Sequence, residues 1–283
     1  MKITVGIDVG STYTKTLLLR EDGTILGRAI EATGFRLTEV ASETLARAAT
    51  QAGIGREDMQ YIVATGFGRH QVTFADVHVT DITASARGTT FLYPHTRTVL
   101  DVGGQTMKAS RLTDGARVKA FRLNDKCAAG TGAFLEKTAR YLGYSTEEIG
   151  PLVATSKEYP SISGVCAVFA ESEVINHLSQ GVAPADIMHG SIVSLVGRSV
   201  QLMKRVKGEP EFTLIGGILR YETMARVARE ELKAHVNVPP GDLVQFVSAL
   251  GAARLGHMRL AQIAAGTAPG AAASGAARAS AAT

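Results

Sequence analysis

Apolar residues recur at every second position over residues 3–9, where Ile, Val, Ile and Val alternate with other residues. This period of two predicts a strand. After a glycine turn at residues 10–12, the chain resumes as an apolar strand through residues 17–19, and Asp22-Gly23 then predicts a hairpin. The chain therefore opens with two strands joined by a glycine turn and continues into a hairpin.

The same order of elements occurs a second time. Residues 99–104 read Val-Leu-Asp-Val-Gly-Gly, another strand is expected around residues 107–109, and Asp114-Gly115 precedes a third strand through residues 118–121. Residues of this kind are common in hairpins, so either copy alone carries little weight. Their repetition in matching context indicates two similar lobes. A strand that ends in a carboxylate and enters a glycine turn brings backbone close to a phosphate and an acid close to a hydrated metal ion.

Helices and strands alternate over the rest of the chain, which predicts an α/β fold of two similar domains. The expected helices lie near residues 38–52, 132–142, 167–180, 185–206, 222–235 and 243–260, and further strands at residues 61–64 and 212–215. We place the first lobe at residues 1–96 and the second at residues 97–263, with the last helix free to pack back on the first lobe. Residues 264–283 are nearly all Ala, Gly, Ser and Thr, a composition that predicts a disordered tail.

Composition and charge narrow the class of protein. Of the 283 residues, 45% are hydrophobic and 20% are charged, which is ordinary for a globular enzyme. The formal net charge is +4 and the basic residues form no run or stripe, so nucleic-acid binding is not expected. Asp8 interrupts the apolar sequence that a signal peptide needs, and no later stretch is long and apolar enough to cross a bilayer. We therefore expect a cytoplasmic protein without a membrane partner.

Two loops have the residue types that hold the phosphates of a nucleotide. The chain has neither the Gly-x-x-x-x-Gly-Lys loop nor a Gly-x-Gly-x-x-Gly sequence after a strand. The first Asp-Val-Gly turn instead offers backbone amides, hydroxyl groups, a lysine and a carboxylate, and the second turn offers a similar set. The candidate cofactor-binding residues of these two loops are Gly10, Ser11, Thr12, Thr14, Lys15, Gly103 and Gly104, and Asp8, Asp101 and Gln105 lie in the same two segments.

The order of these loops resembles that of the superfamily of actin, sugar kinases and seventy-kilodalton heat-shock ATPases, whose domains are ribonuclease H-like. In that superfamily two phosphate loops are followed by a Gly-Gly turn for adenosine, and Gly216-Gly217 takes the third place here. The resemblance implies ATP in the cleft between two such domains. It also implies that Asp8 and Asp101 position water bound to Mg²⁺, and that Gln105 orients the attacking water.

The chain has two cysteines, Cys127 and Cys166. A lasting disulfide is not expected in the cytoplasm, so each cysteine is either a buried small hydrophobe or a ligand. Both lie near the predicted start of a helix, where unpaired amides stabilise negative charge. A [4Fe-4S] cluster usually requires four thiolates, so binding one would require two chains around a shared cluster.

Three sequences around these residues resemble one ATPase family. They are Asp-Val-Gly-Gly-Gln (residues 101–105), Asn-Asp-Lys-Cys-Ala-Ala-Gly-Thr-Gly-Ala-Phe-Leu-Glu (124–136) and Cys-Ala-Val-Phe-Ala-Glu-Ser-Glu (166–173). They resemble the BadF/BadG/BcrA/BcrD-type ATPases, which comprise activators of 2-hydroxyacyl-CoA dehydratases and ATPase subunits of ATP-dependent benzoyl-CoA reductase. The likeness covers most of residues 1–260.

This resemblance implies the cofactor and the partners. Cys127 and Cys166 would bind a [4Fe-4S] cluster shared in a homodimer, or in a heterodimer with a related ATPase subunit. ATP hydrolysis would drive a low-potential electron from a ferredoxin-like donor into a CoA-ester reductase or dehydratase.

One departure from the family pattern bears on which branch we expect. Dehydratase activators continue the second loop as Gly-Gly-Gln-Asp, whereas Thr106 follows Gln105 here. Together with residues 121–123 and the predicted helix over residues 134–141, this difference favours an ATPase subunit of benzoyl-CoA reductase. The alternative is a dehydratase activator. A more distant alternative is a small-molecule kinase, for which the sequence offers no catalytic carboxylate aimed at a substrate hydroxyl.

Overall fold

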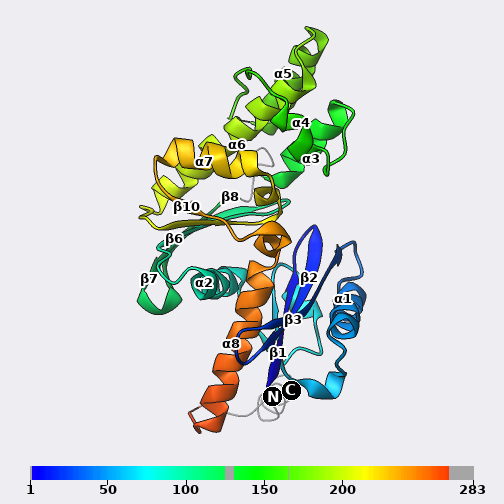
Figure 1. Cartoon of the computed structure of the whole chain (residues 1–283), viewed down its shortest axis with the longest axis vertical. Helices are drawn as coiled ribbons and strands as arrows, with labels where there is room; N and C mark the ends of the chain where they lie inside the picture. The colour runs from blue at the N-terminus through cyan, green and yellow to red at the C-terminus, as the bar shows by residue number, and fades with distance from the viewer. Residues whose placement is uncertain (1, 125–130, 165, 268–283) are drawn as a thin grey trace, which may run out of the picture. The chain divides into compact units, whose positions relative to one another are not determined.

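The computed structural model describes residues 2–124, 131–164 and 166–267 and separates into two compact units (Figure 1). The first unit runs to Gly88 and resumes at Phe246, and the second comprises Thr89–Gln245. The chain thus leaves the first unit once and returns to it with its last helix.

The described part of the first unit forms a five-stranded sheet with the order β3-β2-β1-β4-β5. Its strands are β1 (Ile3–Val9), β2 (Tyr13–Arg20), β3 (Ile25–Ala32), β4 (Met59–Thr65) and β5 (Val77–His78). Strands β1, β2 and β3 are antiparallel neighbours, whereas β4 runs parallel to β1 and β5 parallel to β4. The strand, glycine turn and strand predicted for the start of the chain are confirmed.

Helices α1 (Leu37–Ala52) and α8 (Val247–Ala264) cover the two faces of this sheet, so β1 is buried along its whole length (Figure 1). The hydroxyl group of Thr4 donates to the carbonyl oxygen of Ala253 at 2.8 Å. A Cβ at Gly6 would lie 1.8 Å from the carbonyl oxygen of Ala249, so only glycine allows α8 to approach this closely. The apolar positions of β1 pack with α1, and its small and polar positions lie under α8.

The described part of the second unit repeats this topology. Its sheet has the order β10-β9-β6-β7-β8, which is the first order read from the other edge. The strands are β6 (Thr98–Val102), β7 (Met107–Thr113), β8 (Arg117–Asn124), β9 (Phe212–Ile215) and β10 (Val236–Asn237). Strands β6, β7 and β8 are antiparallel neighbours, and β9 is parallel to both β6 and β10. The prediction of an α/β fold with two similar domains is confirmed.

The helices of the second unit form most of its core. They are α3 (Gly132–Tyr141), α4 (Ile149–Ala154), α5 (Ala167–Ser179), α6 (Pro184–Arg205) and α7 (Glu222–Leu232). Helix α6 begins with Pro184, whose fixed φ suits the first helical turn, and its apolar face is buried with α4, α7 and the sheet. Short 3-10 helices lie at Arg56–Asp58, Arg69–Gln71, Asp114–Ala116, Gly217–Arg220 and Gly241–Gln245.

The sequence analysis did not predict two helices, α4 and α2 (Asp81–Leu92). Helix α2 meets α8 through small residues: a Cβ at Gly88 would lie 2.0 Å from the carbonyl oxygen of Val247, and the hydroxyl groups of Ser85 and Ser248 are 2.9 Å apart. Such contacts leave no pattern of large apolar residues to detect.

At the end of the chain α8 stops at Ala264, and the expected tail lies outside the described residues from position 268 onward. Within the described ranges, we find no helix with the length and apolar character that a membrane span requires.

Candidate functional site

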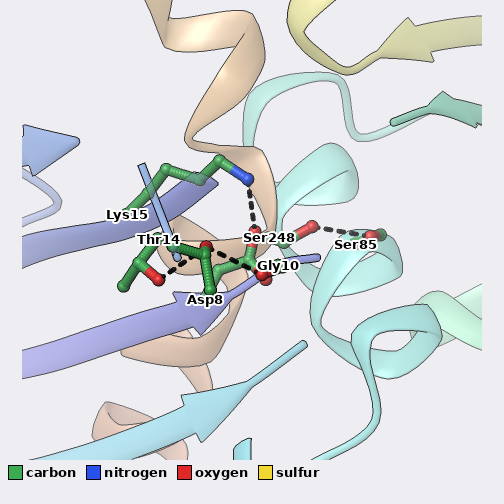
Figure 2. A network of polar contacts seen from close by, with 7 residues as sticks. Asp8, Gly10, Thr14, Lys15, Ser85 and Ser248 are labelled. Carbon is green, nitrogen blue, oxygen red and sulfur yellow. Dashed lines mark hydrogen bonds and ion pairs between the residues drawn. The ribbon is translucent and has the colours of Figure 1, made fainter. Parts of the chain in front are cut away.

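An ion pair lies at the carboxyl end of β1, beside the first glycine turn (Figure 2). Asp8 and Lys15 are register partners on the antiparallel strands β1 and β2. The Nζ atom of Lys15 lies 3.2 Å from Oδ2 of Asp8, and the two side chains are only 16% and 11% exposed. The sheet register therefore brings together two of the predicted site residues.

The turn between β1 and β2 is closed by its own backbone. The amide of Gly10 donates to the carbonyl oxygen of Tyr13 at 3.1 Å. The hydroxyl group of Thr33 donates to the carbonyl oxygen of Gly10 at 2.8 Å and lies 3.0 Å from the hydroxyl oxygen of Thr14. Sequence reasoning missed Thr33, because its contact depends on the pairing of β2 with β3.

The remaining residues of this turn differ in exposure. Ser11 is exposed and Thr12 half-buried, whereas the side chain of Thr14 is fully buried. Ser11 and Thr12 thus offer hydroxyl groups at the surface, and the hydroxyl group of Thr14 faces Thr33 inside the unit.

The segment after β4 packs directly against the end of β1. Gly66 has a φ of +89°, and a Cβ there would lie 2.4 Å from Oδ1 of Asp8. The amide of Gly68 donates to the carbonyl oxygen of Val9 at 2.9 Å. Thr65 is the register partner of Asp8, and its hydroxyl oxygen is buried with no hydrogen-bond partner among the described residues. Gly66 and Gly68 therefore let the backbone after β4 pack closely against the carboxylate of Asp8 and the end of β1.

The second unit builds a matching turn. Asp101 on β6 and Lys108 on β7 are register partners, as Asp8 and Lys15 are in the first unit. The amide of Gly103 donates to the carbonyl oxygen of Thr106 at 2.8 Å, the same four-residue closure as in the first turn. Sequence reasoning did not include Lys108, although its equal spacing from the aspartate would have indicated it.

Gly216 occupies in the second unit the place that Gly66 has in the first. It follows β9, the parallel neighbour of β6, with a φ of +109°. A Cβ there would lie 2.2 Å from the carbonyl oxygen of Val102. Its neighbour Gly217 starts a 3-10 helix, and a Cβ on Gly217 would lie 3.4 Å from Oε1 of Gln245. The predicted Gly-Gly turn thus contacts the end of β6, directly after Asp101.

The N-terminus of helix α3 is hydrogen-bonded to the second glycine turn. The amide of Gly132 donates to the carbonyl oxygen of Gly103 at 2.9 Å, and the amide of Ala133 donates to that of Gly104 at 2.8 Å. Gln105, the next residue of the turn, is exposed. The first turn of α3 and the second glycine turn are therefore held to each other by two backbone hydrogen bonds.

Of the two predicted metal ligands, the structure describes one. Cys166 is half-buried and precedes the first turn of α5 as its N-cap residue, with an extended backbone at φ −142° and ψ 138°. Cys127 lies outside the described residues. No cluster of three or more His, Cys, Asp or Glu side chains suited to a metal ion occurs in the described part of the chain.

An ion pair joins α3 to α5. The Nζ atom of Lys137 lies 2.7 Å from Oε2 of Glu171, and this hydrogen bond raises the pKa of Lys137. Glu173, further along α5, accepts a hydrogen bond from the amide of Ser163. Both acidic side chains of α5 are therefore engaged within their own unit.

Comparison with protein families gives one match over nearly the whole chain. The model of the "BadF/BadG/BcrA/BcrD ATPase family" matches residues 5–256. The "Activator of lactoyl-CoA dehydratase" of Anaerotignum propionicum is 39% identical to this chain, over 88% of this chain and 95% of that protein.

A reductase component and a solved structure are also similar. One of the benzoyl-CoA reductase subunits of Thauera aromatica is 32% identical, over 93% of this chain and 97% of that protein. The structure of the activator of the 2-hydroxyisocaproyl-CoA dehydratase from Clostridium difficile with bound ADPNP superposes with a TM-score of 0.88. It is 34% identical in sequence, and the match covers 94% of this chain and 98% of that one.

Proposed function

Because the chain belongs to the BadF/BadG/BcrA/BcrD ATPase family, we propose that it hydrolyses ATP to activate a 2-hydroxyacyl-CoA dehydratase by electron transfer. The observation that carries this proposal is the repeated turn, in which an aspartate, a register-paired lysine and a closed glycine backbone occur once in each unit. Each of the two turns thus offers amides, a carboxylate and an ammonium group of the kinds that hold nucleotide phosphates and hydrated Mg²⁺.

The partner enzyme proposed here, a 2-hydroxyacyl-CoA dehydratase, is the alternative of the sequence analysis and not its first choice. The sequence analysis places benzoyl-CoA reductase first because of Thr106, which stands where activators have aspartate, together with residues 121–123 and the predicted helix over residues 134–141. The lactoyl-CoA dehydratase activator is 39% identical and the reductase component is 32% identical, which favours the alternative. Thr106 also closes the turn through its carbonyl oxygen, a contact that does not depend on the side chain.

The residues of the turns suit Mg²⁺ and ATP. Carboxylates such as Asp8 and Asp101 hold metal-bound water, and bound Mg²⁺ would neutralise phosphate charge. Ser11 and Thr12 offer hydroxyl groups at the surface of the first turn. Lys15 adds a positive charge next to Asp8. In the second turn the exposed Gln105 would orient the attacking water.

Cys166 fits a ligand of an iron–sulfur cluster. Its thiol is half-buried at the N-terminus of a 13-residue helix, where the unpaired amides of the first turn favour negative charge such as that of a bound cluster. With Cys127, each chain would supply two of four thiolates, so two chains would share one cluster. The bound cluster would supply a low-potential electron. Protein purified without oxygen should then contain about two irons per chain.

A continuous set of contacts connects the second turn to Cys166. The carbonyl groups of Gly103 and Gly104 accept the first amides of α3, and Lys137 of α3 pairs with Glu171 of α5. A displacement of the turn on ATP binding or hydrolysis would therefore move α3 and, through it, the helix that Cys166 begins. We propose that this is how the ATPase reaction acts on the electron-transfer site.

The proposal is tested by activation of isolated partner enzymes without oxygen. The protein, ATP and a low-potential reductant are mixed with a 2-hydroxyacyl-CoA dehydratase and its substrate, and in parallel with benzoyl-CoA reductase lacking its ATPase subunits and benzoyl-CoA. We expect ATP-dependent turnover of the dehydratase only. Turnover of benzoyl-CoA alone would instead indicate an ATPase subunit of benzoyl-CoA reductase. ATP hydrolysis without turnover of either substrate would contradict the proposal that the protein is an activator.

A cysteine variant separates the two halves of the function. Cys166→Ala should lose dehydratase activation and iron while ATP binding persists, because the thiol lies outside both turns. Ser172→Ala, on the exposed face of the same helix, is the matched control and should retain both. Equal loss of iron and of ATP binding in Cys166→Ala would show that Cys166 supports packing instead.

A further inference from the structure

Thr65 has the one buried hydroxyl group of the first unit that finds no hydrogen-bond partner among the described residues. A buried hydroxyl group without a partner destabilises the folded state, so this exception indicates a role outside the packing of the unit. The other buried hydroxyl groups described in this unit are all paired: Thr4 with the carbonyl oxygen of Ala253, Thr14 with Thr33, Thr16 with Thr44, and Ser85 with Ser248.

The sheet register places Thr65 next to the ion pair of the first turn. Thr65 ends β4 as the register partner of Asp8 on β1, and Asp8 is in turn the register partner of Lys15 on β2. Register partners share a face of a sheet, so these three side chains form a row across β2, β1 and β4. They lie on the α8 face, because Thr4 and Gly6, at alternate positions before Asp8, both contact α8.

The two oxygens of the Asp8 carboxylate have different neighbours. Oδ2 lies 3.2 Å from Nζ of Lys15 (Figure 2), whereas Oδ1 faces the segment that follows Thr65, where a Cβ at Gly66 would lie 2.4 Å away. Adjacent strands are about 4.8 Å apart, so rotation about χ1 of Thr65 brings its hydroxyl group within reach of Oδ1. Thr65 can therefore donate to the carboxylate from the side opposite Lys15.

We propose that Thr65 is a positioning residue, whose hydroxyl group donates to Oδ1 of Asp8 when a magnesium–nucleotide complex binds. The phosphates draw the ammonium group of Lys15 away from Oδ2, and the hydrogen bond from Thr65 then keeps the carboxylate in the orientation that hydrated Mg²⁺ requires. Hydrogen bonds to a charged acceptor are roughly twice as strong as neutral ones. This inference rests on the proposed function, in which Asp8 holds metal-bound water, and it adds a residue that acts through Asp8.

The test is a calorimetric titration of the full-length chain with ADP, once in excess Mg²⁺ and once in excess EDTA. Thr65→Val removes the hydroxyl group at nearly constant shape, and Thr65→Ser retains it. Thr16→Val is the matched control, because it removes a buried hydroxyl group from the opposite face of the same sheet, where Thr16 contacts Thr44 of α1. Urea unfolding is measured for each variant.

We expect Thr65→Val to bind ADP about tenfold more weakly than the native chain in Mg²⁺, and within about twofold of it in EDTA. Thr65→Ser and Thr16→Val should bind within about twofold of the native chain under both conditions. The urea midpoint of Thr65→Val should be equal to or above the native midpoint, since an unpaired hydroxyl group is replaced by a methyl group.

Three results would overturn this inference alone: native affinity of Thr65→Val in Mg²⁺, equal weakening in Mg²⁺ and in EDTA, or equal weakening in Thr16→Val. A lower urea midpoint of Thr65→Val, or its failure to fold, would show that the hydroxyl group serves packing and would also overturn it. If the native chain itself bound no ADP in Mg²⁺, the inference and the proposed ATPase function would fall together.

Discussion

Replacement of Gly216 by alanine tests the packing of the Gly-Gly turn on β6. At a φ of +109° an alanine is strained, which costs about 1–3 kcal/mol. Its Cβ would lie 2.2 Å from the carbonyl oxygen of Val102 and 2.7 Å from the carbonyl carbon. These are backbone atoms of a central strand and cannot rotate away, so the overpacking adds about 1–3 kcal/mol. We expect Gly216→Ala to lower the free energy of unfolding by about 3 kcal/mol.

A matched glycine isolates the contribution of the clash. Gly143 also has a positive φ, +84°, but a Cβ there would meet nothing within 4 Å. Gly143→Ala should therefore cost only the backbone strain, about 1 kcal/mol. Urea unfolding followed by circular dichroism measures both variants. Equal losses of stability would refute the argument that contact with Val102 fixes Gly216.

Three further predictions follow from single contacts. Lys15→Met leaves the nearly buried carboxylate of Asp8 without its ammonium partner, so it should lower the free energy of unfolding in urea by about 3 kcal/mol. A loss below about 1 kcal/mol would mean that the ion pair is solvated. Glu171→Gln removes a partly exposed ion pair and should change stability by less than about 1 kcal/mol, yet reduce ATP-dependent dehydratase activation; unchanged activation would exclude this contact from the coupling. Burial lowers the pKa of His257 below 6.5, although its contact with the carbonyl oxygen of Leu19 opposes the shift, so the folded state binds its proton less readily than the unfolded chain. Stability should be full above pH 6.5 and fall as the pH drops below it, and His257→Gln should flatten this loss in thermal melts at pH 5 to 7; an unchanged slope would contradict the assignment.

The repeated strands and turns could be predicted because they depend on local sequence. The alternation over residues 3–9 and the Asp-Val-Gly turns mark each strand and the point where it ends, and the structure has strands at both places. Register pairing of Asp8 with Lys15 then follows from the length of the turn between β1 and β2.

The contacts made by distant segments could not be predicted in the same way. Thr33 reaches the first turn only after β3 pairs with β2, and Gly66 approaches Asp8 only because β4 lies parallel to β1. The sequence analysis assigned no chemistry to residues 65–69. The structure gives them a physical role, since a side chain at Gly66 would collide with the carboxylate of Asp8.

The most direct test of the role of the two glycine turns is the rate of ATP hydrolysis by Asp8→Asn, Asp101→Asn and the double variant. Asp114→Asn is the control. Asp114 lies in an exposed hairpin of the second unit, and its side chain is 94% exposed. If ATP hydrolysis requires both turns, each single variant should lose about 100-fold or more in rate, and the double variant should be no slower than the slower single variant. The control should hydrolyse ATP at the native rate. A native rate in either Asp8→Asn or Asp101→Asn would contradict the account.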